Sequence, residues 1–205
     1  MAETKKPKEP RYLKEALFLA ESYTKMLEER EWLKKRIAGN WTYTKEMAIA
    51  ELDSITVAYD NERVQSSNIS NPTERIAMKL TDEYMARKQA EMDAERDACI
   101  ADLEYLNWKI GVVDAVIRER LDDELKDMFT LQYKGNRTYK QTKDILAKKR
   151  ERKVCNDKIK RQKDSILELL VRELILRSNA HADRQFIGRL QQETQTVKEQ
   201  AEDGE

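Results

Sequence analysis

The sequence has few of the residues on which most enzymes and secreted proteins depend. Its 205 residues include a single histidine, His181, and two cysteines, Cys99 and Cys155, which lie far apart and outside any CxxC pair. Structural disulfides and a zinc site are therefore not expected, because both need such residues at suitable spacing. The P-loop, the GxGxxG fingerprint and the HExxH motif are all absent. We therefore expect no enzyme, no cofactor and no metal site.

Glycine, proline and long apolar runs are scarce as well. The chain has five glycines and three prolines, with 38% charged and 40% hydrophobic residues. Strand signals are missing too, since no alternating run is bounded by hairpin turns. This profile is typical of long helices with charge pairs, so the predicted fold class is all-α. No apolar run reaches the roughly 20 residues that cross a bilayer, and the start lacks a signal-peptide pattern, so we expect a cytoplasmic protein without membrane spans.

Apolar periodicity divides the first part of the chain into helices. Residues 11–37 and 43–64 carry apolar side chains at helical spacing, and the Asn-Pro-Thr-Glu sequence at 71–74 is a strong start for a long helix. That helix has a coiled-coil-like seam with 4-3-4-3-4 spacing. The seam consists of Cys99, Leu103, Leu106, Ile110, Val113 and Ile117. We predict an elongated helical bundle over 11–121, preceded by a disordered tail at 1–10.

The two signs of charge are separated along the chain, although the net charge is zero. Residues 82–127 contain fourteen acidic and seven basic side chains, whereas residues 137–163 contain twelve basic and three acidic ones. A solvated helix normally mixes signs in i,i+4 pairs, and crowding like charges is unfavourable unless a polyanion neutralises them. The basic run therefore predicts contact with nucleic-acid phosphate. A lysine-rich flank without a specific role is the competing interpretation.

The order of elements around the basic run fits a helix-turn-helix domain. A support helix at 125–133 leads through the turn KGNR to a short helix at 139–146. A second turn then precedes a basic helix from about Asn156 onward, which would enter the major groove. We predict a helix-turn-helix-like nucleic-acid-binding domain over 122–178. Residues 179–205 are predicted to form a polar, acidic and partly disordered tail.

Two stretches of this region carry a family resemblance. ELKDMFTLQYKGNRTYKQTKDIL resembles the opening of a sigma-factor region-four-like domain, and VCNDKIKRQKDSIL resembles its recognition helix. With the upstream helices and the loop SNISNPTERIA included, the chain from about Tyr12 to Leu176 is similar to the phage-encoded RinA-like transcriptional activators and related late-operon regulators. The resemblance implies a DNA-binding regulator of phage genes in a bacterial host, acting through host RNA polymerase on double-stranded DNA.

Residue by residue, the resemblance implies two kinds of DNA contact. Asn156, Lys158, Lys160 and Arg161 would occupy the exposed face of the recognition helix. Of these, Asn156 is the candidate for reading adenine and Arg161 for guanine. The other cations would contact phosphates, which position a protein without reading bases. They are Arg137, Lys140, Lys148, Lys149, Arg150, Arg152, Lys153 and Lys163.

Two alternatives remain open from the sequence. The link AKKRERK is longer than the usual tight turn, so the first helix could instead continue through Lys153 and form a helical hairpin with a basic tip. Such a hairpin would bind polyanions without reading sequence. A second hypothesis is a helical interaction protein that docks on a host protein or ribonucleoprotein. The seam and the apolar stretch 166–176 would also suit a homodimer that binds paired DNA half-sites.

Overall fold

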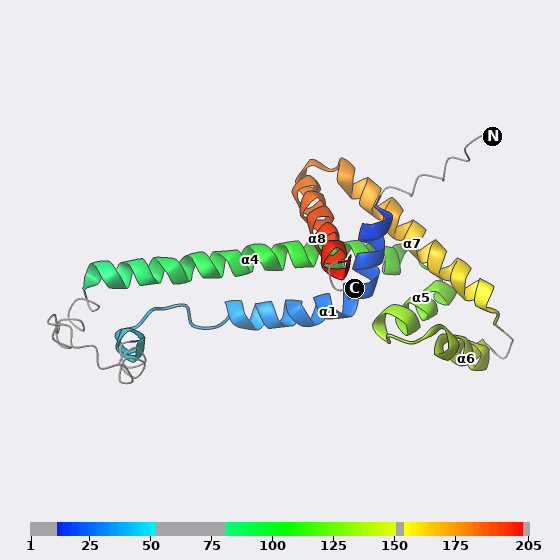
Figure 1. Ribbon diagram of the computed structural model, residues 1–205, viewed down its shortest axis with the longest axis horizontal. Coiled ribbons are helices and arrows are strands. Elements are labelled where there is room, and N and C mark those ends of the chain that lie inside the picture. The colour runs from blue at the N-terminus through cyan, green and yellow to red at the C-terminus, as the bar shows by residue number, and fades with distance from the viewer. Residues whose placement is uncertain (1–11, 52–80, 151–153, 203–205) are drawn as a thin grey trace. The chain divides into compact units, whose positions relative to one another are not determined.

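The computed structural model describes residues 12–51, 81–150 and 154–202 (Figure 1). Within these ranges the regular elements are helices and no strand occurs, which confirms the all-α prediction. Contacts divide the chain into two compact units: unit 1 comprises residues 1–32 and 104–205, and unit 2 comprises residues 33–103. Among the described helices, none is both long and apolar enough to span a membrane.

Helices α1 and α4 each contribute to both units, whereas the later elements belong to unit 1 alone. Short π-helical and 3-10 turns, η1 and η2, continue or connect these helices. The elements are α1 (Leu13–Ile37), α4 (Asp82–Glu119), α5 (Asp123–Phe129), η1 (Thr130–Lys134), α6 (Tyr139–Arg150), α7 (Asn156–Asn179), η2 (His181–Asp183) and α8 (Arg184–Glu202). The domain that the sequence predicts over 122–178 lies within unit 1.

Local signals account for several helix boundaries. Helix α1 ends at Ile37, just before the Gly39-Asn40 stop signal. Asp122 caps α5, because its Oδ1 accepts a hydrogen bond from the backbone N–H of Leu125 at 2.7 Å. The predicted support helix is present as α5 and η1 together. Of the two turn residues after it, Asn136 is left-handed with φ 46°, whereas Gly135 has φ −89°.

Unit 2 combines the end of α1, a helical segment at 45–51 and the first part of α4. The Gln89 side chain joins them, because its amide donates to the Trp41 carbonyl oxygen at 2.8 Å and accepts from the Tyr43 N–H at 2.8 Å. Helix α4 begins at Asp82. The predicted helix beyond residue 51 and the predicted helix start at 71–74 lie outside the described residues.

The core of unit 1 is formed by apolar faces of α1, α4, α5 and α7. Leu19 of α1, Phe129 of α5 and Ile166 of α7 are all fully or almost fully buried. In α4 the buried stripe is wider than a two-position seam, because Val112 and Val116 are buried beside the predicted seam residues. Burial of several large side chains per helix supplies the main stabilising free energy of such a unit.

Helix α7 is one continuous helix that contains both the predicted basic helix and the predicted apolar segment. Ile159, Ile166 and Leu170 are fully buried at helical spacing, so a single face fastens α7 to the unit. Buried Glu173 on the same helix accepts hydrogen bonds from Arg120 at 3.0 Å and Arg177 at 2.9 Å. These contacts hold α7 along its length. The outer side of its first turns is exposed to solvent.

Helix α8 takes up most of the tail that the sequence predicts to be polar and partly disordered. Ile187 and Leu190 are buried, and the Phe186 ring lies 5.6 Å from the Trp108 ring and 5.8 Å from the Tyr105 ring, centroid to centroid. The stretch predicted as partly disordered is therefore helical from Arg184 to Glu202. The physical reason is that three side chains at i, i+1 and i+4 form a compact apolar face, in which Phe186 packs on rings of α4, and α8 also contacts α7.

Candidate nucleic-acid interface

The interface region consists of the end of η1, the turn after it, α6 and the first turns of α7 (Figure 1). Helix α6 extends to Arg150, which is four residues beyond the predicted end at Leu146. Helix α7 begins at Asn156, as predicted, and the residues just before it are not helical. Residues 138–163 therefore form two helices and not one unbroken helix.

Buried apolar side chains hold α6 and α7 in place. Leu146 of α6 and Ile159 of α7 are fully buried, and Val154 just before α7 is nearly so. Leu146 holds α6, whereas Val154 and Ile159 hold the start of α7. These anchors turn one face of each helix into the core, and most of the polar side chains on the opposite side are exposed, whereas Thr142 and Gln162 are buried.

Five of the predicted contact residues are exposed cations that make no ion pair with the described part of the chain. They are Arg137, Lys140, Lys148, Lys160 and Arg161. Asn156 is exposed as well, at the first position of α7. Lys163 is half-buried, and its Nζ stands 6.0 Å from the centroid of the Tyr133 ring. These side chains come from the turn, from α6 and from α7.

Two predicted contact residues are instead held by acids on α5. The Lys158 ammonium lies 3.0 Å from a carboxylate oxygen of Glu124, which also accepts from the Gln162 amide at 2.9 Å. The prediction that Lys158 lies on the exposed face is wrong, because the side chain is half-buried against α5. Lys149 Nζ lies 2.7 and 2.8 Å from the two carboxylate oxygens of Asp127. Opposite charge across the helix interface is the reason for both positions.

Three predicted contact residues cannot be placed as side chains. Arg152 and Lys153 lie outside the described residues, and so does the side chain of Arg150, whose backbone ends α6. Their predicted phosphate contacts stay predictions. Arg152 and Lys153 belong to the linker between the two helices that carry the exposed cations.

The exposed side of α7 also carries acids that the prediction did not use. Asp157, Asp164 and Glu168 are exposed, at spacings of seven and four residues. Past the first turns they outnumber the cations on the outer side, so approach to a polyanion is confined to the beginning of α7. The sequence does contain this signal, as acids spaced at the helical period.

A hollow of about 350 Å³ links the beginnings of α6 and α7. Tyr139, Asn156, Lys160 and Lys163 line it together with two acids of α7. Tyr139 is 44% exposed, which is high for so large an aromatic side chain. Sequence reasoning missed this residue, although an aromatic side chain within a basic region is a signal for nucleic-acid contact. The hollow brings three predicted contact residues next to one ring.

The region can contact a polyanion along α6 and offer hydrogen-bonding groups at the start of α7. Lysine and arginine bind phosphate, whereas the Asn156 amide offers a donor and an acceptor to a base edge. The assignment of a function therefore rests on the chemistry of these side chains. Comparisons of the chain with protein-family models, with curated proteins and with solved structures found no match.

Proposed function

We propose that this chain is a DNA-binding transcriptional regulator that places the first turns of α7 in the major groove. The observation that carries the proposal is the pair of exposed cations, Lys160 and Arg161, next to exposed Asn156 at the start of a firmly anchored helix. Exposed Lys140 and Lys148 on α6 would contact phosphates on the flank. In helix-turn-helix proteins the N-terminal residues of the second helix meet the base edges, which fits this distribution.

The acids of α7 support a shallow mode of entry. Asp164 and Glu168 would approach phosphates if the helix lay along the groove for its whole length, and like charges would then repel. Entry by the first turn and a half avoids this repulsion. Asp157 then lies close enough to the contact to accept from a cytosine amino group.

We also propose that the regulator is of the phage-encoded RinA-like type. The sequence resemblance supports this assignment through the block around α5, the KGNR turn and α6, together with the start of α7. It would place the protein in the cytoplasm of a bacterial host cell, acting on a phage operon through host RNA polymerase. A homodimer would let two copies of α7 meet paired half-sites.

Duplex binding measured against salt tests the function directly. Fluorescence anisotropy of a labelled duplex, titrated with the full chain, should give an affinity that falls linearly on a log–log plot against salt. With about five phosphate contacts, the slope would be roughly −4.5. Absence of duplex binding at low salt, or an affinity that salt does not change, would contradict the proposal.

The second candidate function is protein interaction, and the exposed acids of α4 favour it. Glu91, Asp93, Glu95 and Asp97 are all exposed in unit 2, where Glu91 and Glu95 form ion pairs with basic side chains and Asp93 and Asp97 lie on the other side of the helix. Such a surface fits a basic partner protein. Affinity capture from bacterial lysate, with and without nuclease, separates the two functions. A basic partner that persists after nuclease treatment, without duplex binding by the purified chain, would favour interaction.

Release of Lys149 from its internal partner should strengthen duplex binding. In the variant Asp127→Asn the ammonium loses its ion pair on α5 and becomes free to contact a phosphate. One added phosphate contact corresponds to about fivefold tighter binding at roughly 0.15 M salt. Anisotropy titrations of parent and variant with the same duplex measure this change.

Asp123→Asn is the matched control for this variant. It makes the same charge change on α5, but Asp123 is fully exposed and its nearest cation is Lys126 at 4.0 Å. Binding by this variant should stay within about twofold of the parent. Equal effects of the two variants would show that general charge, and not release of Lys149, controls the affinity.

A further inference from the structure

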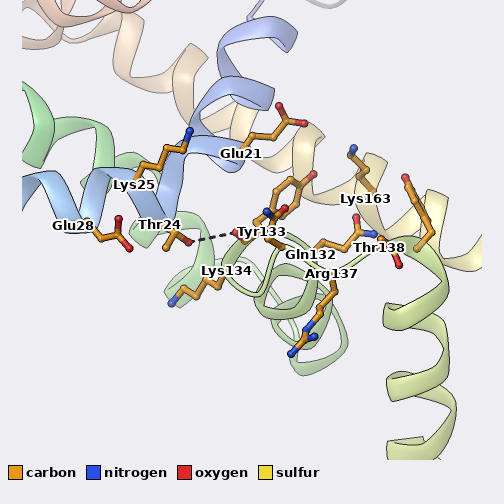
Figure 2. Close-up of a pocket in the computed structure, with 12 residues that line it drawn as sticks. Glu21, Thr24, Lys25, Glu28, Gln132, Tyr133, Lys134, Arg137, Thr138 and Lys163 are labelled. Carbon is orange, nitrogen blue, oxygen red and sulfur yellow. Dashed lines mark hydrogen bonds between the residues drawn. The ribbon is translucent and has the colours of Figure 1, made fainter.

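A second hollow of unit 1 has a volume of about 550 Å³ (Figure 2). It lies between the middle of α1, α7, and η1 with the turn that follows it. We name it the Tyr133 pocket. Its lining includes four cations and two carboxylates. They are Lys25, Lys134, Arg137, Lys163, Glu21 and Glu28. The volume lies within the range of small-molecule sites.

The backbone on one side of the pocket is irregular. Tyr133 and Lys134 belong to the π-helical turn η1, and Asn136 after it has a left-handed φ of 46°. Thr24 on α1 donates a hydrogen bond to the Tyr133 carbonyl oxygen at 3.4 Å, so α1 supports this turn. Isolated π turns and non-glycine residues with positive φ gather at functional sites in proteins. Both features are therefore consistent with a ligand site at this turn.

The Tyr133 hydroxyl is a buried donor that lacks a partner within the described chain. The residue is 7% exposed, and its oxygen makes no hydrogen bond. Burial raises the pKa of the phenol above its usual value, so the group stays protonated and can donate. Figure 2 shows the hydroxyl on the side of the pocket where Lys163 and Glu21 lie. Buried polar groups are nearly always paired, and a ligand would supply the missing partner.

The mixture of side chains restricts the class of ligand. Cations call for an anionic group, whereas carboxylates only accept hydrogen bonds and therefore call for hydroxyl or amino donors. The exposed ring of Tyr139, which also lines the pocket, offers a flat surface for stacking. A phosphate, sugar hydroxyls and a heteroaromatic base together match these three requirements.

We propose that the Tyr133 pocket binds a nucleoside phosphate. The ammonium and guanidinium groups of Lys163 and Arg137 contact the phosphate, which also accepts a hydrogen bond from the Tyr133 hydroxyl. Glu21 accepts from sugar hydroxyls, and the base stacks on Tyr139. The ligand is either a free nucleotide or one nucleotide of a single strand. This inference does not rest on duplex binding, because the pocket does not include Lys160 or Arg161.

Calorimetric titration of the full chain with the four ribonucleoside 5′-monophosphates tests the proposal. At least one should bind saturably, and its nucleoside, ribose 5-phosphate and inorganic phosphate should each bind at least about tenfold more weakly. Arg137→Gln and Tyr133→Phe should each weaken binding by about tenfold. Tyr133→Phe should not lower the melting temperature, because it removes a hydroxyl that has no partner. A destabilised Tyr133→Phe variant would contradict the role of the unpaired hydroxyl.

Two further measurements complete the test: one is a control variant, and the other distinguishes a free nucleotide from a nucleotide within a strand. Arg118→Gln changes an exposed cation of unit 1 outside the pocket and should leave nucleotide affinity unchanged. If a short oligothymidylate binds instead of monophosphates, and both pocket variants weaken it, the ligand is a nucleotide within a strand. The proposal is overturned if neither ligand saturates the chain by about 1 mM. It is also overturned if phosphate binds as tightly as the nucleotide, or if both pocket variants bind like the parent.

Discussion

Replacing Lys160 and Arg161 together by glutamine is expected to weaken duplex DNA binding about thirtyfold at roughly 0.15 M salt. Both side chains are exposed on the first turns of α7 and make no ion pair with the described residues. Each is therefore able to contact DNA without first breaking an internal interaction. Each of the two cations neutralises DNA charge from within the groove, so the loss of each is worth about fivefold at this salt, and the salt slope should become shallower by about 1.8. Anisotropy titrations over a salt series measure both quantities.

Arg118→Gln combined with Arg172→Gln provides the matched control. The two residues lie in unit 1, are exposed, and each forms an i,i+4 ion pair, with Asp114 at 3.8 Å and with Glu168 at 2.6 Å. The control makes the same change in net charge but leaves the start of α7 intact. If the Lys160 and Arg161 variant shows the affinity and slope of this control, the start of α7 does not contact DNA.

Lys158 shows why the choice of residues in that experiment matters. Its ammonium is bound to Glu124, so neutralising it would disturb the packing of α5 on α7 as well as the surface charge. A triple variant that included it would confound loss of binding with loss of structure. The sequence places Lys158 beside other cations and gives no sign of its partner, which lies 34 residues away.

Much of the helical framework could be predicted because it depends on neighbouring residues. The end of α1 follows from Gly39-Asn40, and the start of α5 follows from the capping carboxylate of Asp122. The apolar anchors Val154 and Ile159 were predictable for the same reason, since each follows from the local pattern of polar and apolar residues.

The features that the sequence did not predict depend on contacts between distant residues. Helix α8 has few apolar residues, and its docking needs the rings of Tyr105 and Trp108, which come from α4. The sequence likewise could not show which cations are exposed and which are paired, because the acids that pair with Lys149 and Lys158 lie on α5. Local periodicity identifies which face of a helix is apolar, but not which charged residue on the other face finds a partner.

Replacing Glu193 by alanine is expected to lower the free energy of unfolding by about 3 kcal/mol. Lys109 is 7% exposed, and its Nζ lies 3.1 Å from Oε2 of Glu193, which also accepts from the Tyr105 hydroxyl at 3.0 Å. The variant leaves a buried ammonium and a phenol without this carboxylate. The Glu193 side chain is one-third exposed, so water can solvate part of the site. The expected loss of unfolding free energy is therefore at the lower end of the range for breaking a buried ion pair. Urea denaturation measures it.

Two further variants decide whether the buried pair causes that loss. Glu199→Ala removes an exposed carboxylate from the same helix and should change stability by less than about 0.5 kcal/mol. Lys109→Met combined with Glu193→Leu replaces the pair by apolar side chains and should recover most of the stability, because the uncompensated charge is then gone. Recovery will be incomplete, since the Tyr105 hydroxyl still lacks its acceptor and the ammonium 4.5 Å from the centroid of that ring is lost. If Glu193→Ala costs no more than Glu199→Ala, the ion pair does not contribute to holding α8 on α4.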